Sequence, residues 1–179
     1  MSETALELGE TAPDFTLPDT DGTEHRLAGR TGAPATVVVF TCNHCPYALA
    51  WHDRIAAVAG DHVGRGVTVF NINANDASRY PDDSLEAMRT RVAREGWQMP
   101  YLHDQSQEVA RAFGAQVTPD VFVLDAELRL RYRGAPDSGY DDPGQDAGWL
   151  RSALDAVLAG RRPDPELTDP VGCSIKWRP

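Results

Sequence analysis

The residues with the clearest chemical potential are two cysteines, Cys42 and Cys45, in the stretch Thr41-Cys42-Asn43-His44-Cys45-Pro46. The pair follows an apolar run at 36–40 and opens a segment whose apolar residues recur at helical spacing. Two cysteines separated by two residues at a strand-to-helix junction are typical of a dithiol that cycles with a disulfide. Pro46 is tolerated there, because the first amides of a helix have no acceptor within it.

Apolar periodicity predicts the elements that must hold this dithiol. We predict strands at 36–40, 67–72, 101–102, 121–124 and 128–133, and helices at 46–60, 83–96, 104–114 and 149–160. Asp83-Ser84-Leu85-Glu86 and Asp104 to Gln107 have the spacing of capping boxes. Arg129, Arg131 and Arg133 alternate with apolar residues and predict a solvated strand face, and we expect the loop at 135–146 to be exposed.

This order predicts an α/β fold in which helices flank a central mixed β-sheet on both faces. A turn at Asp19-Thr20-Asp21-Gly22 predicts an N-terminal β-hairpin extension within 9–27. We expect one domain over residues 1–160. The tail at 161–179 carries four prolines, and we expect it to be irregular and to pack back on the domain.

Bulk composition excludes several classes of partner. The net charge of −10 over 179 residues argues against binding to nucleic acid or to an anionic membrane. The first seven residues do not have the basic start and apolar core of a secretory signal, and no apolar run approaches the roughly 20 residues of a membrane span. Three cysteines are too few for a disulfide-stapled secreted scaffold. We therefore expect a cytoplasmic protein, as a monomer or a weak dimer.

Three motifs outside the dithiol carry a family resemblance. Gly9-x-x-Ala12-Pro13-Asp14-Phe15, with Leu17, Asp19 and Gly22, resembles the opening signature of the AhpC/TSA or redoxin group, the peroxiredoxin-like branch of the thioredoxin fold. Val117-Thr118-Pro119-Asp120 is similar to the thioredoxin-fold loop whose proline is cis and faces the dithiol. The dithiol segment and Gly172-Cys173-Ser174-Ile175-Lys176-Trp177 together resemble a thioredoxin-like subfamily of peroxiredoxin relatives.

The resemblance implies a thiol-disulfide oxidoreductase, with a possible part in antioxidant defence and with neither cofactor nor metal. Its substrate would be a protein or small-molecule disulfide, and its reductant thioredoxin or a low-molecular-weight thiol. An extended substrate would pair with the backbone at Val117, beside Cys42, in a short β-augmentation. The substrate-binding residues would be Thr41, Asn43, His44, Val117, Thr118 and Pro119.

Helix geometry predicts the roles of the two thiols. At a helix N-terminus Cys42 would face unpaired amides and the positive end of the helix dipole, which lower a cysteine pKa below its usual ~8.5. His44 adds a cation or a hydrogen-bond donor. A stabilised thiolate favours the reduced form, so we predict a reduction potential less negative than the ~−270 mV of thioredoxin. Cys42 is then the attacking thiol, and Cys45 resolves the mixed disulfide.

Two departures from the family patterns limit the activities that the resemblance implies. Peroxiredoxins place their peroxidatic cysteine in Pro-x-x-x-Thr-x-x-Cys, but Ala35 and Val39 stand at the proline and threonine positions before Cys42. Thioredoxins bury an aspartate six residues before the first cysteine, where this chain has Thr36. A thiol-dependent peroxidase that uses Cys42 is the enzymatic alternative.

Cys173 admits two interpretations. It is either an additional redox residue, a second resolving thiol that the tail brings to the site, or a small buried residue that anchors the tail with Ile175 and Trp177. A binding protein is the remaining alternative. Cys42, His44 and Cys45 are soft ligands of the kind that a Cu(I) or Zn metallochaperone or sensor uses.

Overall fold

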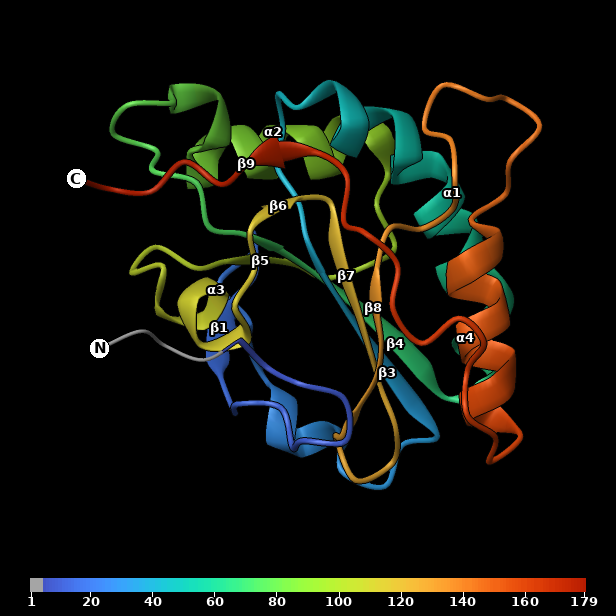
Figure 1. Cartoon of the computed structure of the whole chain (residues 1–179). Coiled ribbons are helices and arrows are strands. Elements are labelled where there is room, and N and C mark those ends of the chain that lie inside the picture. The colour runs from blue at the N-terminus through green and yellow to red at the C-terminus, as the bar shows by residue number, and fades with distance from the viewer. Residues whose placement is uncertain (1–4) are drawn as a thin grey trace.

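The computed structural model describes residues 5–179 as a five-stranded mixed sheet with helices on both faces (Figure 1). The strands are β1 Thr16–Pro18, β2 Glu24–Arg26, β3 Ala35–Phe40, β4 Val67–Asn73, β5 Tyr101–His103, β6 Val117–Thr118, β7 Asp120–Leu124, β8 Leu130–Gly134 and β9 Cys173–Ser174. The α-helices are α1 Pro46–His62, α2 Leu85–Glu95, α3 Glu108–Phe113 and α4 Gly148–Leu158.

The central sheet has the strand order β5-β4-β3-β7-β8. β3, β4 and β5 are parallel, whereas β7 runs antiparallel to both β3 and β8. Every residue of β3 is buried, because the strand has a partner on each side and helices on each face. This explains why its sequence does not alternate between apolar and polar residues.

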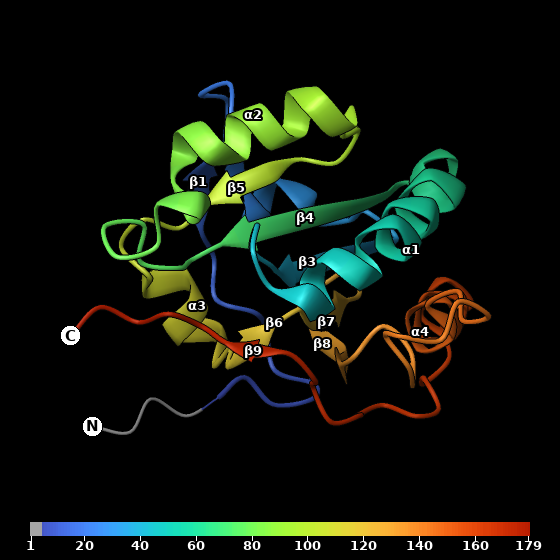
Figure 2. The ribbon, with the colours of Figure 1, turned by 90° about the horizontal axis from the view of Figure 1, so that it is seen from above.

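Two apolar clusters hold the layers together. On one face, α1 and α4 contribute Trp51, Ile55, Leu150 and Leu154 against the odd-numbered valines of β3. On the other face, α3 and the β1–β2 hairpin pack against Val38, Phe40, Phe70 and Phe122. Figure 2 shows α1 and α4 on one side of the sheet and α3 on the other. The predicted fold class, including the antiparallel hairpin of β1 and β2, is confirmed.

Several predicted boundaries and caps are wrong. Helix α1 continues past Gly60 to His62, and the chain leaves it through a 3₁₀ turn that ends at Gly66, where φ is +80°. Ser84, not Asp83, caps α2 by accepting a hydrogen bond from the Ala87 amide. Asp104 is not the N-cap of α3, which is Gln107, although its carboxylate accepts a hydrogen bond from the Ala110 amide. Gln107 does not complete a capping box, since its side chain donates to the carbonyls of Ala74 and Lys176 instead.

Two charged residues expected in solvent are mostly buried. Arg133 pairs with the fully buried Asp120 at 2.9 Å, so its side chain does not lie on the solvated face that we predicted. The side chains of Arg129 and Arg131 remain accessible to solvent on that face. Asp137, in the loop predicted to be exposed, accepts hydrogen bonds from Trp51 Nε1 and from Arg54. Both carboxylates are paired because an isolated buried charge is strongly unfavourable.

The C-terminal tail contains a short strand where the sequence indicated none. β9 pairs antiparallel with β6, with Thr118 opposite Cys173 and Val117 opposite Ser174. Figures 1 and 2 both show β9 beside β6, at the end of the sheet where α1 begins. Among the described residues, no helix is long and apolar enough to cross a membrane. Residues 1–4, part of the stretch from which we expected no secretory signal, lie outside the described residues.

Candidate active site

The dithiol loop begins where β3 ends and is fixed there by a backbone hydrogen bond from Thr41 N to Ile72 O, 2.8 Å long. Helix α1 starts at Pro46, with Cys45 as its N-cap residue. The expectation that Cys42 stands at the helix N-terminus is therefore wrong by three residues. Cys45 takes that position, and Cys42 lies in the loop before it.

Both thiols are buried under the loop that follows β6. Cys42 is 1% exposed and Cys45 is fully buried, and both are free thiols. Cys42 Sγ lies 3.3 Å from Thr118 Oγ1, and Cys45 Sγ lies 3.3 Å from the Thr118 carbonyl oxygen. The Thr118-Pro119 peptide bond is cis, as the resemblance implied. The predicted residue Thr118 thus lies directly against both thiols, and Pro119 follows it across the cis bond.

The pKa values of the two thiols depend on each other. The hydrogen bond from Cys42 is the main cause that lowers the pKa of Cys45 to about 4. The same bond, followed by burial and by the charge of Asp83, raises the pKa of Cys42. A pair in hydrogen-bond contact keeps one proton between its two sulfur atoms. The structure thus centres the negative charge on Cys45, where the sequence placed it on Cys42.

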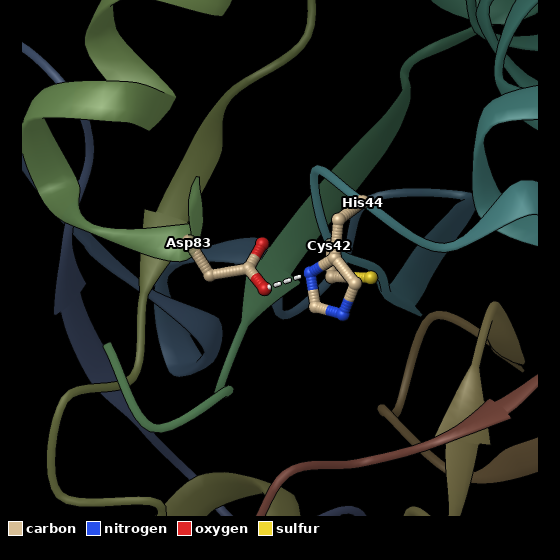
Figure 3. Close-up of side chains that lie close together, drawn as sticks. All are labelled: Cys42, His44 and Asp83. Atoms are coloured by element: carbon tan, nitrogen blue, oxygen red, sulfur yellow. Dashed lines mark ion pairs between the residues drawn. The ribbon is translucent and has the colours of Figure 1, made fainter. Parts of the chain in front are cut away.

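His44 and Asp83 form an ion pair next to Cys42. Nδ1 of His44 contacts Oδ2 of Asp83, whose carboxylate is fully buried. Figure 3 shows the imidazole facing the carboxylate, with the Cys42 sulfur on its other side. The ring also stacks on Tyr80 with its plane at 5°. His44 is therefore held in one orientation while 29% of its side chain remains exposed.

Asp83 is fixed by three further donors. Its carboxylate accepts hydrogen bonds from the backbone of Asn43 (2.7 Å) and from the side chains of Asn73 and Asn75 (3.0 Å each). Thr36, at the position of the buried thioredoxin aspartate, has an Oγ1 atom without a hydrogen-bond partner among the described residues. The carboxylate near the dithiol thus comes from the start of α2 and not from β3.

Asn43 is bonded within the protein and leaves little for a substrate. Its Nδ2 donates to the Asp82 carbonyl, and its Oδ1 accepts from Tyr101 Oη (2.7 Å) and from Arg91 Nη1 (3.1 Å). Arg91 also donates to the Cys42 carbonyl at 3.1 Å. These contacts hold the dithiol loop against α2 and β5.

Cys173 completes the set of thiols. It packs against Cys42, Cys45 and Ala48, and its thiol interacts directly with that of Cys45. Burial, together with the neighbouring Cys45, raises the pKa of Cys173 to about 11.

The possible metal ligands at this site differ from those predicted. One group of three donor atoms lies within 4.8 Å of one another among the described residues, and it consists of Cys42, His44 and Asp83. Cys45, which we included in the alternative with a Cu(I) or Zn site, is not in this group.

Sequence reasoning missed Asp83 and Arg91. We assigned Asp83 to a capping box from its spacing to Glu86, but Ser84 is the residue that caps α2. Arg91 stands three residues after Met88 on the buried face of α2, so a charge on an apolar helical stripe was the available signal.

Comparison with known proteins identifies the family of the chain. The family model described as Redoxin matches residues 7–147. The thiol-disulfide oxidoreductase ResA of Geobacillus thermodenitrificans is 26% identical over 131 residues, which cover 72% of this chain and 70% of that protein.

Two solved structures match nearly the whole chain. An uncharacterised protein from Geobacillus kaustophilus is 39% identical with a TM-score of 0.93, and the match covers 98% of this chain and 95% of that one. A hypothetical protein from Sinorhizobium meliloti is 41% identical with a TM-score of 0.91, and the match covers 98% and 97%. More distant solved structures share the thioredoxin-like fold. The chain belongs to the Redoxin family.

Proposed function

We propose that the chain is a thiol-disulfide oxidoreductase whose redox couple is the dithiol and disulfide of Cys42 and Cys45. The observation that carries the proposal is the contact of both thiols with Thr118, in the loop with the cis bond to Pro119. The ResA relative, a thiol-disulfide oxidoreductase by name, supports the same reaction.

The reaction proceeds by two thiol-disulfide exchanges. Cys42 attacks one sulfur of a substrate disulfide after its proton passes to Cys45 through their hydrogen bond. A Cys42–substrate disulfide forms, and the first substrate thiolate leaves and takes up a proton. Cys45, deprotonated again, attacks the Cys42 sulfur, forms the Cys42–Cys45 disulfide and releases the second substrate thiolate. The substrate gains two electrons and two protons. The dithiol supplies both electrons and its one shared proton, and solvent supplies the second proton.

His44 is the acid that we assign to the leaving thiolate. Its ring lies beside Cys42 and is partly open to solvent, whereas Asp83 is buried behind it. Asp83 is a positioning residue, because it orients the imidazole toward Cys42. Asn43 positions the loop through Asp82, Arg91 and Tyr101.

The substrate in this proposal is a protein or small-molecule disulfide, and the reductant is thioredoxin or a low-molecular-weight thiol. An antioxidant role in the cytoplasm fits such a reaction. The test is trapping on the Cys45→Ser variant, which retains the attacking thiol but cannot resolve the mixed disulfide. We expect a stable adduct with a cysteine-containing peptide disulfide on Cys42, and Cys42→Ser is the matched control. No adduct on Cys42 contradicts the proposal.

Peroxide consumption coupled to a thiol reductant separates exchange from peroxidase activity. We expect no turnover beyond that of the reductant alone, because the peroxidatic pattern around Cys42 is absent. Catalytic consumption that Cys42→Ser abolishes would instead support the peroxidase.

A metal-binding protein is the second candidate, and the cluster of Cys42, His44 and Asp83 favours it. Zinc accepts thiolate, imidazole and carboxylate ligands. Asp83, however, already accepts from Asn43, Asn73 and Asn75. Metal analysis of anaerobically purified protein decides: one equivalent of metal with loss of titratable thiol would favour this candidate over exchange.

A further inference from the structure

The C-terminal strand β9 occupies the edge of β6 on which an extended substrate would pair. In the proposed reaction the backbone at Val117 offers its hydrogen bonds to the substrate. In the structure Val117 and Thr118 are paired instead with Ser174 and Cys173 of the same chain. The residue paired with Thr118 is thus Cys173. A substrate on the same edge would place its disulfide sulfur at this position.

Gly172 allows this close approach. A Cβ atom at position 172 would overlap the carbonyl oxygen of Thr118, so no other residue fits without displacing the tail. On its other side β9 continues into Ile175, which is buried in the apolar core and whose amide donates to the Gln116 carbonyl at 3.1 Å. The strand is therefore built into this edge and not merely close to it.

The last residues fix the tail further. The Lys176 carbonyl accepts from the Asp76 amide (2.9 Å) and from Gln107 Nε2 (2.9 Å), and the Arg178 amide donates to Gln107 Oε1 (3.0 Å). Trp177 lies under the guanidinium of Arg111 at 4.4 Å. Contacts on both sides of Cys173 thus hold its thiol in place.

The thiol of Cys173 meets Cys45 rather than Cys42. Cys173 packs against the cluster of Cys42, Cys45 and Ala48, and besides burial it is the Cys45 thiol in that cluster that raises the pKa of Cys173. Cys42 and Cys45 are 1% and 0% exposed, whereas Cys173 is partly exposed. Of the three cysteines, Cys173 is therefore the one whose side chain solvent reaches.

We propose that β9 is an intramolecular occupant of the substrate edge and that Cys173 is a third redox residue, which exchanges with the Cys42–Cys45 disulfide through Cys45. This inference rests on the proposed function of the dithiol. In the step, the Cys173 thiolate attacks the Cys45 sulfur. The Cys45–Cys173 bond forms, the Cys42–Cys45 bond breaks, and the Cys42 thiolate takes the proton that Cys173 lost. No electrons are gained or lost overall, so no further oxidant or reductant is needed.

The exchange moves the disulfide to a residue that an external reductant can reach. A thiol reductant then attacks Cys173 at the surface, and Cys42 is already reduced for the next substrate. The tail must leave β6 when a peptide substrate pairs there, so the strand and the substrate alternate at one edge.

Disulfide mapping in glutathione redox buffers, after acid quenching and alkylation, tests the exchange. We expect wild-type protein to give both Cys42–Cys45 and Cys45–Cys173 disulfides. Cys42→Ser should give Cys45–Cys173, and Cys45→Ser should give no internal disulfide. A Cys42→Ser variant without the Cys45–Cys173 bond, or a Cys42–Cys173 bond in Cys45→Ser, would overturn the inference. Wild-type protein without any Cys42–Cys45 disulfide would instead refute the proposed function.

The Gly172→Ala variant tests the strand without changing a thiol. We expect it to lose most of the Cys45–Cys173 disulfide, keep the Cys42–Cys45 disulfide and increase the alkylation rate of the reduced pair. Gly29→Ala is the matched control, because a Cβ at position 29 meets no atom within 4 Å. If Gly172→Ala keeps both disulfides in wild-type proportions and the wild-type alkylation rate, β9 does not deliver Cys173 and the inference fails.

Discussion

At the scale of single residues, the acid–base equipment of the dithiol comes from an unexpected place. The thioredoxin aspartate position holds Thr36, and the carboxylate stands on the other side of the cysteines at Asp83. His44 thereby gains a defined orientation toward Cys42, which a histidine in an unsupported loop would not have.

Replacing Asp83 by Asn tests this arrangement. Without the carboxylate, His44 is no longer held toward Cys42, and we expect turnover to fall by up to the ~10²-fold that a positioned general acid contributes. The charge of Asp83 also raises the pKa of Cys42, so its removal shifts the pH profile of Cys42 alkylation to lower pH. Stopped-flow exchange and alkylation across pH measure both effects.

The control for this variant is Asp82→Asn, which changes the exposed neighbour of Asp83. The Asp82 backbone carbonyl, which holds Asn43, is unaffected by that substitution. An Asp83→Asn protein with the wild-type rate and pH profile would show that the carboxylate is only structural.

The shared proton of the dithiol predicts how the reduction potential depends on pH. Cys45, with its pKa lowered to about 4, is a thiolate between pH 5 and 8, and Cys42, with a raised pKa, is protonated. Reduction of the disulfide then takes up one proton for two electrons, so the potential becomes more negative by about 30 mV per pH unit. Equilibration of Cys173→Ser protein with glutathione buffers measures this slope. A slope near ~59 mV, two protons for two electrons, would contradict the single-thiolate pair.

At the scale of elements, α2 contributes to the site through its first turn and its buried face. Ser84 caps the helix directly after Asp83, and Arg91 reaches the dithiol loop two turns later. Loss of an N-cap serine costs about 1 kcal/mol. We expect Ser84→Ala to lower the free energy of unfolding by that amount in urea denaturation. Ser152→Ala, an exposed substitution within α4, should change it little, and equal effects of the two would argue against the cap.

Elements formed by contacts between residues close in the sequence can be predicted from the sequence. Side chains whose positions depend on distant partners cannot. β3 is recognisable as a short unbroken apolar run and α1 by its helical apolar periodicity, so the positions of both are visible in the sequence. The side chains of Asp83 and Asp137 are placed by partners far along the chain, Asn43 and Trp51. Their local sequences fit a capping box and an exposed loop equally well. Only the tertiary structure decides between these alternatives.

The cysteine site shows the same division. The Cys42/Cys45 pair and the Thr118-Pro119 loop are recognisable because their motifs are short and contiguous. The start of α1 at Pro46 is also predictable, because proline is favoured at the first position of a helix. The sequence did not show that Cys45, and not Cys42, therefore takes the N-cap position.

At the scale of the whole molecule, four distant parts of the chain meet at one end of the sheet. The dithiol loop follows β3, Asp83 precedes α2, Thr118 ends β6, and Cys173 starts β9. The central sheet and two apolar clusters hold these parts in fixed relation. Because the site is assembled from segments that only the whole fold holds together, oxidation of the dithiol affects the stability of the entire fold.

This coupling predicts that reduction stabilises the protein. A disulfide ordinarily stabilises a fold, mainly by constraining the unfolded chain. Here the native structure stabilises the thiolate of Cys45, whose pKa is lowered to about 4, and this interaction is lost both on oxidation and on unfolding. Because the folded pKa is depressed, the contribution is present at high pH and is lost as the pH falls toward 4.

At pH 7 we therefore expect reduced Cys173→Ser protein to unfold at a higher urea concentration than its oxidised form. Each 30 mV by which the potential exceeds that of the unfolded dithiol corresponds to about 1.4 kcal/mol of this difference. Urea denaturation of both forms at pH 7 and pH 5 gives the free energies, and the advantage of the reduced form should shrink at pH 5. An oxidised protein that is the more stable form at both pH values would exclude a stabilised thiolate at Cys45, and with it the prediction of a potential less negative than that of thioredoxin.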